Sequence, residues 1–163
     1  MILVSACLFN IPVRYKGDGN LCELLLPLAA RGLLLPFCSE AAGQLPTPRP
    51  PAEICGGTGQ DVWRGAARVV NAQGQDVTEA FKLGAQRCAE ICRQYYISAA
   101  ILKQRSPSCG SAAVYDGSFQ KRLLPGMGVA AALLAQQGVK IYSEEDLTEE
   151  LLHKLLANEQ QRR

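Results

Sequence analysis

The sequence has little that points to a membrane or to nucleic acid. No apolar run approaches the roughly 20 residues that a membrane-spanning helix needs, which argues against such a span. The apolar start ILVSACLF is short and no basic segment precedes it, so we expect no signal peptide and a cytoplasmic protein. The net charge of +2 comes without a basic stripe and predicts neither a nucleic-acid-binding surface nor a membrane-binding one.

Histidine is also scarce, whereas cysteine is common. The one histidine, His153, lies on a predicted terminal helix far along the chain from the cysteines of interest, and we assign it no role. The chain has seven cysteines, an odd number that does not suit a closed disulfide framework. In a cytoplasmic protein we expect these cysteines to be reduced or bound to metal.

The remaining composition is that of a globular protein. The 163 residues are 48% hydrophobic and 20% charged, which is enough apolar material for a hydrophobic core and excludes wholesale disorder. We therefore expect a single domain over residues 1–163, with residues 144–163 as a terminal helix extension.

Four short apolar runs predict strands of one buried sheet. The first three predict buried strands, and the first shows no polar alternation, as is typical of a strand covered on both faces; helical patterns separate the four runs. They are ILVSAC (2–7), LLLPFC (33–38), AAILK (99–103) and VKIYS (139–143). Strands that alternate with helices predict an α/β fold, a three-layer sandwich around a mostly parallel sheet.

Helices and one insertion fill the rest of the pattern. Helices are predicted over 21–31, from Asp76 to about residue 95, over 126–138 and after Ser143. The proline-rich stretch around 46–51 predicts extended backbone wrapped over the domain. DVWRG and AARVVN (61–71) predict a small antiparallel insertion.

A cysteine lies at the end of two of the predicted strands and in the loop after a third. Cys7 and Cys38 close the first two strands, and Cys109 follows the third in the loop SPSCG. Since loops at the carboxyl ends of parallel strands line one crevice, these thiols are expected at one edge of the sheet. Three soft thiolates suit an iron–sulfur cluster with one free iron, or a catalytic zinc with a water ligand. Buried core thiols are the alternative.

The other four cysteines are expected in the hydrophobic core or near the site. Cys88 and Cys92 fall four residues apart in an apolar helical stripe, so core packing is favoured over chelation of a metal. Cys22 is also expected in the core. Cys55, before two glycines, is the best candidate for an extra thiol near the site.

Several blocks of the chain resemble the thiouracil desulfurase family, long catalogued as a domain of unknown function. The resemblance runs from Ile2 to Glu145 and is most specific at LPTPRPPAEI and SPSCGS. It implies a 4Fe–4S cluster held by only three cysteines, here Cys7, Cys38 and Cys109. Three residues depart from the family pattern: Ser39 replaces a proline, Gln44 a glycine and Lys16 an acidic residue.

The resemblance implies removal of sulfur from a thiolated pyrimidine such as 2- or 4-thiouracil. The expected reaction is a hydrolytic, non-redox conversion of C=S to C=O with release of sulfide. Glu40 is the expected base, and Ser106 is expected to orient the water or the intermediate. The residues expected to contact the substrate are Ser108, Arg49, Lys103 and Tyr15.

Two other classes of function remain open at this point. The same cysteines suit a redox-sensing or metal-sensing module without turnover. A nucleotide-binding α/β protein with structural thiols is the other. For the enzyme, the expected partners are a small thiolated nucleobase and a sulfide acceptor.

Overall fold

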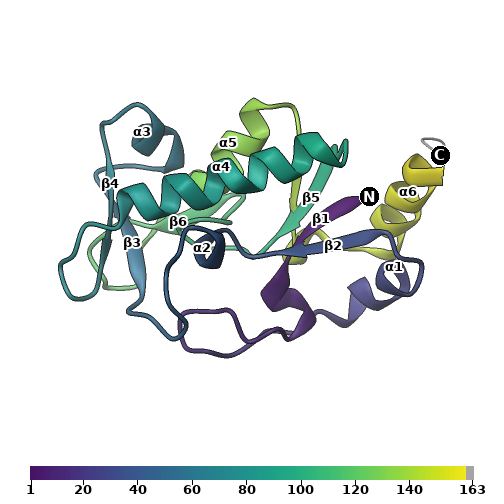
Figure 1. Cartoon of the computed structure of the whole chain (residues 1–163), viewed down its shortest axis with the longest axis horizontal. Helices are drawn as coiled ribbons and strands as arrows, with labels where there is room; N and C mark the ends of the chain where they lie inside the picture. The colour runs from purple at the N-terminus through teal and green to yellow at the C-terminus, as the bar shows by residue number, and fades with distance from the viewer. Residues whose placement is uncertain (161–163) are drawn as a thin grey trace.

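A four-stranded parallel sheet forms the centre of the protein (Figure 1). The computed structural model describes residues 1–160. The strand order is β2-β1-β5-β8, with β1 at Ile2–Ser5, β2 at Leu34–Phe37, β5 at Ala99–Leu102 and β8 at Lys140–Ser143. All three pairings are parallel, as the sequence predicted.

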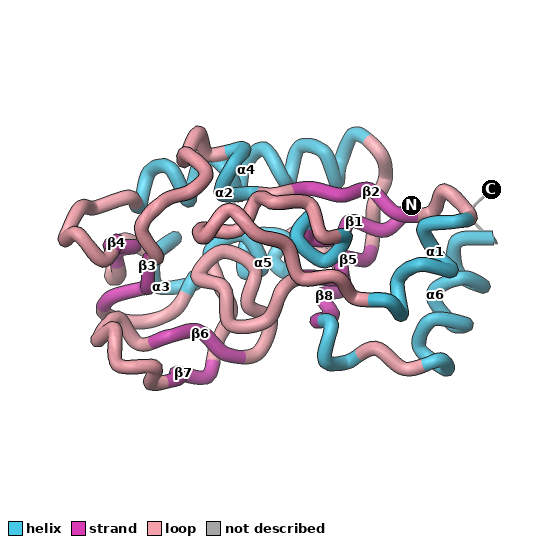
Figure 2. Tube along the Cα trace, turned by 90° about the horizontal axis from the view of Figure 1, so that it is seen from below, coloured by secondary structure: helices cyan, strands magenta, loops and turns pink. Residues whose placement is uncertain are grey.

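Helices cover both faces of this sheet, which confirms the three-layer sandwich. Ile2 and Val4 of β1 face a core completed by α1 (Leu26–Ala30) and α6 (Glu149–Gln160). Leu3, between them, faces the opposite core with α4 (Thr78–Gln94) and α5 (Val129–Gln136). The alternation follows from the two-residue period of a strand. Figure 2 shows α1 and α6 side by side at one end of the molecule.

The second predicted strand is not fully buried, which corrects the expectation for residues 33–38. β2 is an edge strand, and Pro36 in it is exposed. Proline has no backbone N–H to donate to a further strand, so it is tolerated at an edge. Position 36 is therefore compatible with the sheet because no strand lies beyond it.

The predicted antiparallel insertion is present, but its strands are assigned differently. Gly59–Trp63 forms the short helix α3, which starts with a capping box between Thr58 and Asp61. The partner of β4 (Arg68–Asn71) is instead β3 (Ala52–Cys55), directly after the prolines. A second antiparallel pair, β6 (Ala113–Tyr115) with β7 (Leu123–Pro125), was not predicted, because each strand has only three residues.

The remaining short helices lie at strand ends or before the terminal helix. Residues 21–31 form a 3₁₀ turn, η2 (Glu23–Leu25), before α1, because Pro27 fits only the first helical turn. The 3₁₀ turn η1 (Ala6–Phe9) follows β1, and α2 (Ser39–Ala42) follows β2. Ser143 and Asp146 form a capping box at the 3₁₀ turn η3 (Glu144–Asp146) and not at the terminal helix, as was predicted, because α6 begins only at Glu149. The end of the predicted terminal helix, 161–163, lies outside the described residues.

Two of the expected core cysteines are in the core. Cys88 and Cys92 lie on the buried face of α4, where both are almost fully buried against the sheet. Within residues 1–160, no helix combines the length and the hydropathy that a membrane span requires.

Candidate functional site

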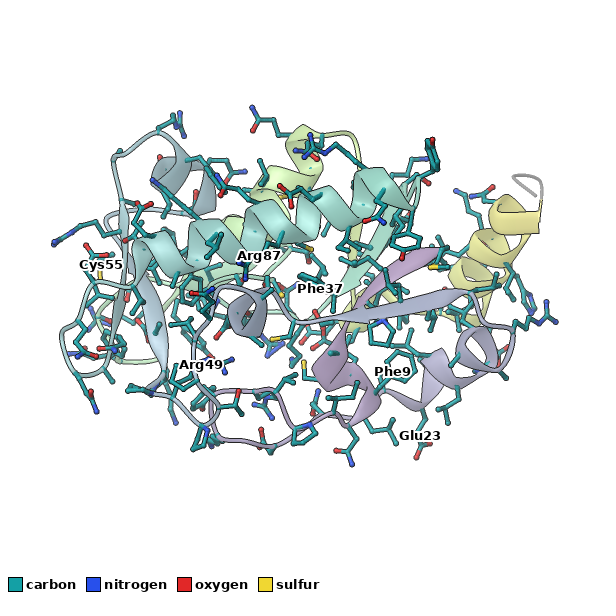
Figure 3. The ribbon with its side chains drawn as sticks, in the orientation of Figure 1. Phe9, Glu23, Phe37, Arg49, Cys55 and Arg87 are labelled. Atoms are coloured by element: carbon teal, nitrogen blue, oxygen red, sulfur yellow. The ribbon has the colours of Figure 1, made fainter. Side chains whose placement is uncertain are left out.

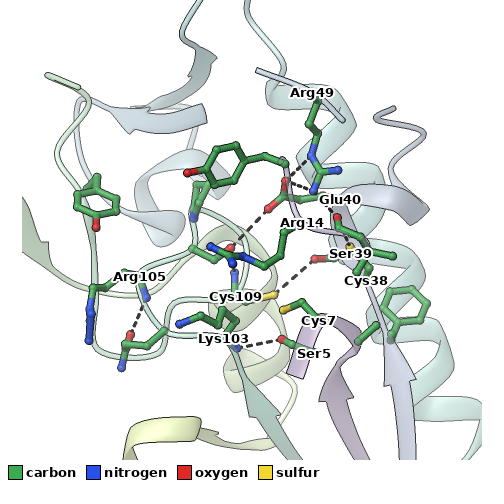
Figure 4. Close-up of a pocket in the computed structure, with 18 residues that line it drawn as sticks. Ser5, Cys7, Arg14, Cys38, Ser39, Glu40, Arg49, Lys103, Arg105 and Cys109 are labelled. Carbon is green, nitrogen blue, oxygen red and sulfur yellow. Dashed lines mark hydrogen bonds and ion pairs between the residues drawn. The ribbon is translucent and has the colours of Figure 1, made fainter. Parts of the chain in front are cut away.

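A cavity of about 240 Å³ opens at the carboxyl edge of the sheet (Figure 4). The parallel register aligns the ends of three strands there, since Ser5 pairs with Phe37 and Val4 with Ile101. The chain leaves each strand at this edge, so the residues that follow line the cavity. The loop at 13–15, Arg49 and Tyr115 of β6 complete the wall.

Three cysteines from three strand ends line this one cavity. Cys7 lies in η1 after β1, Cys38 precedes α2 after β2, and Cys109 lies in the loop after β5. All three are free thiols. The topological expectation that Cys7, Cys38 and Cys109 meet at one sheet edge is therefore met.

The environment of these thiols opposes ionisation. Burial, followed by the sulfurs of Cys109 and Cys38, raises the pKa of Cys7 to about 12. Burial also raises the pKa of Cys109 to about 11 and raises the pKa of Cys38. Three such thiols do not ionise together near neutral pH unless a positive charge is placed among them.

This set of donors is compatible with an iron–sulfur cluster. In a cluster each thiolate binds a different iron, so the sulfurs need not converge on one point. Among the described residues, no three His, Cys, Asp or Glu side chains meet closely enough to hold a single metal ion.

Hydrogen-bond donors surround two of the sulfurs. The backbone N–H groups of Ala41 and Glu40, in the first turn of α2, act to lower the pKa of Cys38, against the larger effect of burial. The hydroxyls of Ser5 and Ser39 act to lower the pKa of Cys109, and Ser39 Oγ lies 3.8 Å from its sulfur, where either atom can be the donor. Such groups stabilise thiolates and are the usual neighbours of metal-bound sulfur.

Glu40 is held at the cavity wall by Arg49. The Arg49 guanidinium donates to Oε2 of Glu40 through Nε and Nη2, both at 2.8 Å. The same guanidinium donates to the carbonyl oxygens of Val13 and Pro46, at 3.0 and 3.1 Å. The Arg49 side chain is only 5% exposed. Arg49 was expected to donate to a substrate, but its donors are occupied in fixing the carboxylate.

Ser106 lies on the other side of the Glu40 carboxylate. Its Oγ accepts hydrogen bonds from the backbone N–H groups of Ser108 and Cys109, both at 3.1 Å. The hydroxyl proton is therefore directed outward, and Oε1 of Glu40 lies 3.5 Å away. Ser106 thus caps the turn that carries Cys109 and also faces the carboxylate.

The cations around the cavity are paired with acidic side chains. Lys103 forms an ion pair with Glu144 of η3, and Arg105 forms one with Glu145. Arg14 pairs with Asp18 at 3.2 Å. Charges of Lys103 and Arg14 act to lower the pKa of Cys7, against the larger effect of burial. The expected substrate contacts Lys103 and Tyr15 both line the cavity.

Two expectations differ from the structure. Ser108 is fully buried and is not among the residues that line the cavity, because its hydroxyl faces Ser39 behind the wall. Cys55 lies on β3, at the β3–β4 end of the molecule (Figure 3), and donates to the carbonyl oxygen of Gly117. Cys55 is therefore not an additional thiol of this site.

Several lining residues were missed by sequence reasoning. They are Ser5, Arg14, Ser39, Gln104, Arg105 and Tyr115. Gln104 and Arg105 directly follow a predicted strand that leads to Cys109, and this position was an available signal. Tyr115 had no such signal, because the hairpin that carries it was not predicted.

Gln104 organises the loop between β5 and Cys109. Its Oε1 accepts from the backbone N–H groups of Arg105 and Ser111, both at 3.1 Å, and its Nε2 donates to Oγ of Ser111 at 3.0 Å. A single buried carboxamide thereby closes a loop of eight residues. This closure fixes where Cys109 enters the cavity.

Comparison with known proteins gives three consistent similarities. A family model described as 2-thiouracil desulfurase matches residues 2–146. Uncharacterized protein YbbK of Bacillus subtilis (strain 168) is 44% identical over 149 residues, which are 91% of this chain and 99% of that protein. A solved structure described as the 4Fe-4S-dependent thiouracil desulfidase TudS is 42% identical, with a TM-score of 0.82. The match covers 95% of this chain and 97% of that one.

Proposed function

Because the chain belongs to the 2-thiouracil desulfurase family, we propose that it removes sulfur from a thiolated pyrimidine such as 2- or 4-thiouracil. In the proposed reaction, water replaces the sulfur of a C=S group, giving a carbonyl product and sulfide. One observation carries the proposal: three unpaired cysteines from three strand ends share a cavity with a braced carboxylate. The 42% identity to a thiouracil desulfidase supports the same reaction.

In this proposal Cys7, Cys38 and Cys109 hold a 4Fe–4S cluster through three of its irons. The named dependence of the similar structure on such a cluster supports this cofactor, as does the set of three soft donors. When bound, the cluster supplies a soft Lewis acid that prefers a thiocarbonyl sulfur to a carbonyl oxygen.

Glu40 is the proposed base that takes a proton from the attacking water. Arg49 occupies Oε2 of Glu40, so Oε1 is the oxygen left to accept that proton. Ser106 faces the same oxygen and, because its acceptor side is used by the turn, can only donate toward the cavity. Glu40 and Ser106 together define a position for one water between them.

The remaining wall is suited to a small planar ring. The cavity is smaller than the roughly 300–1,000 Å³ of pockets for drug-sized ligands, which favours a free base or a ligand of similar size. Tyr15 and Tyr115 offer aromatic faces for stacking. Lys103 and Arg14 offset negative charge that develops as water adds to the ring.

An anaerobic assay tests the proposed function. The full chain, purified without oxygen or reconstituted with iron and sulfide, is incubated with 2-thiouracil, and uracil and sulfide are quantified. Equal amounts of both products are expected. A cluster-loaded protein without turnover would favour the sensing module, whereas a chain that stays colourless and inactive after reconstitution would favour the nucleotide-binding alternative.

A further inference from the structure

Two buried hydroxyls lead from the protein interior to the sulfur of Cys109. Ser39 and Ser108 are 3% and 0% exposed, so neither hydroxyl is hydrated from solvent. Their Oγ atoms lie 2.5 Å apart. Ser39 Oγ also lies 3.8 Å from Sγ of Cys109, within hydrogen-bond distance for sulfur. The three polar atoms therefore form one continuous chain.

The direction of this chain follows when Cys109 is a metal-bound thiolate. Such a sulfur has no proton and can only accept, so the Ser39 hydroxyl must donate to it. The single proton of Ser39 is then used, and Ser108 must donate to Ser39 Oγ. Donors in a chain polarise one another, so Ser108 strengthens the bond that Ser39 makes.

Hydrogen bonds and packing of the backbone hold both serines in place. The carbonyl oxygen of Ser108 accepts from the first N–H groups of α5, at Ala130 and Ala131. The carbonyl oxygen of Ser39 accepts from Gly43 and packs directly on Gly84 of α4. Neither serine can turn its hydroxyl elsewhere by moving its backbone.

We propose that Ser39 and Ser108 form a hydrogen-bond relay that tunes the Cys109 ligand and thereby raises the reduction potential of the cluster. The inference rests on the proposed function, since it needs a cluster bound through Cys109. Hydrogen bonds to ligand sulfur stabilise electron density there, and this is one of the means by which proteins set cluster potentials. Ser39 and Ser108 act here as positioning residues that do not touch the substrate.

At position 39 the hydroxyl can be removed by a substitution that suits the local backbone conformation. Ser39 is the first residue of α2, where proline is favoured because the first N–H of a helix has no partner within it. Cys38 before it has φ −121° and ψ 108°, the extended conformation that a following proline requires. Ser39→Pro therefore removes the donor while keeping the local backbone, and Ser39→Ala removes it with a different side chain.

The test is a redox titration of the reconstituted full chain, followed spectroscopically under anaerobic conditions. In Ser39→Ala and Ser39→Pro we expect the equilibrium constant for reduction to fall by about two- to tenfold, which is roughly 20–60 mV for one electron. Ser108→Ala should lower the potential less, and Ser39→Ala/Ser108→Ala should match Ser39→Ala alone. Ser118→Ala is the control, because its exposed hydroxyl accepts from the backbone N–H of Gln120 in the turn between β6 and β7, outside the cavity wall, and its removal should leave the potential unchanged.

The outcomes separate this inference from the proposed function. A parent chain that binds no cluster contradicts the proposed function and removes the premise of the relay. A parent with a cluster whose potential is the same in both Ser39 variants contradicts the relay alone. Loss of the cluster in both Ser39 variants but not in Ser118→Ala would also contradict it, in favour of a purely structural role.

Discussion

The carboxylate of Glu40 combines two properties that a base in a metal site needs. Its side chain is 17% exposed, so it reaches the cavity but has little freedom to rotate. Arg49 binds one oxygen through a planar fork, which fixes the orientation of the carboxylate as well as its charge. The other oxygen remains directed at Ser106 and the cavity.

Glu40→Gln tests the role of this oxygen. We expect the cluster absorbance to be retained and kcat to fall by about 10²-fold or more, because a carboxamide cannot accept the proton of water. Uracil formation at saturating substrate measures the effect. Glu79→Gln, on an exposed carboxylate of α4, is the matched control and should be as active as the parent. An unaltered rate in Glu40→Gln would remove this residue from the mechanism.

The backbone at position 44 is strained for a residue that carries a side chain. Gln44 has φ +69°, in the left-handed region that glycine adopts without steric cost. The resemblance described in the sequence analysis implies a glycine at this position, where this chain has Gln44 in the turn that follows α2. The turn therefore retains its left-handed conformation in this chain, although Gln44 lowers the free energy of unfolding.

Gln44→Gly should stabilise the protein. Relief of left-handed strain contributes about 1–2 kcal/mol, and the greater flexibility of unfolded glycine offsets part of it, so a net gain of about 0.5–1 kcal/mol is expected. Chemical denaturation measures the free energy of unfolding. Gln44→Ala retains the Cβ atom and should show no such gain; an equal gain in both variants would contradict the role of strain.

At the scale of elements, the site depends on how closely α2 packs against α4. A Cβ atom on Gly84 of α4 would lie 1.8 Å from the carbonyl oxygen of Ser39, and one on Gly43 would lie 2.1 Å from that of Ala80. Arg87 of α4 also donates to the carbonyl oxygen of Ala42. Figure 1 shows α2 directly beside α4. Since α2 follows Cys38 and carries Glu40, this contact sets the position of the proposed ligand Cys38 and of the proposed base Glu40.

Gly84→Ala should therefore impair the site from a distance. The added methyl group forces α2 away from α4, and overpacking of this kind costs about 1–3 kcal/mol. We expect less cluster per chain after reconstitution and lower activity, measured as iron content and uracil formation. Gln86→Ala, on the exposed side of the same helix, is the control. Full cluster content and activity in Gly84→Ala would show that α2 tolerates the shift.

At the scale of the molecule, the parts that follow from hydropathy and strand order could be predicted from the sequence. The four parallel strands and the meeting of Cys7, Cys38 and Cys109 belong to this class, because a parallel sheet places its loops at one edge. The pairing of Arg49 with Glu40 could not be predicted. It depends on the path of the proline-rich segment around the edge of the domain, and composition predicts extended backbone without its direction.

The same limit applies to the contact between Ser39, which lines the cavity, and Ser108, which lies behind it. Ser39 and Ser108 are 69 residues apart in the chain, and only the packing of α2 and α5 around the sheet brings their hydroxyls together. Local patterns carry no information about such a contact. Tyr115 reaches the cavity from a hairpin whose strands are too short to show an alternation.

The proposed cluster would join the ends of β1, β2 and β5, so its removal should destabilise the whole molecule. A ligand that binds only the folded chain adds about 2.7 kcal/mol at 100 times its dissociation constant, which is roughly 5–10 °C in Tm for a chain of this size. Thermal unfolding of cluster-loaded and cluster-free protein measures this increment.

The same increment in Tm and the cluster absorbance should both be lost in each of three variants, Cys7→Ala, Cys38→Ala and Cys109→Ala. Cys88→Ala removes a thiol from the core of α4 and should keep both, while its baseline stability falls on the order of 1 kcal/mol, as when one buried methylene is deleted. Equal loss in all four variants would show that the three cavity thiols have no special part in binding the cluster.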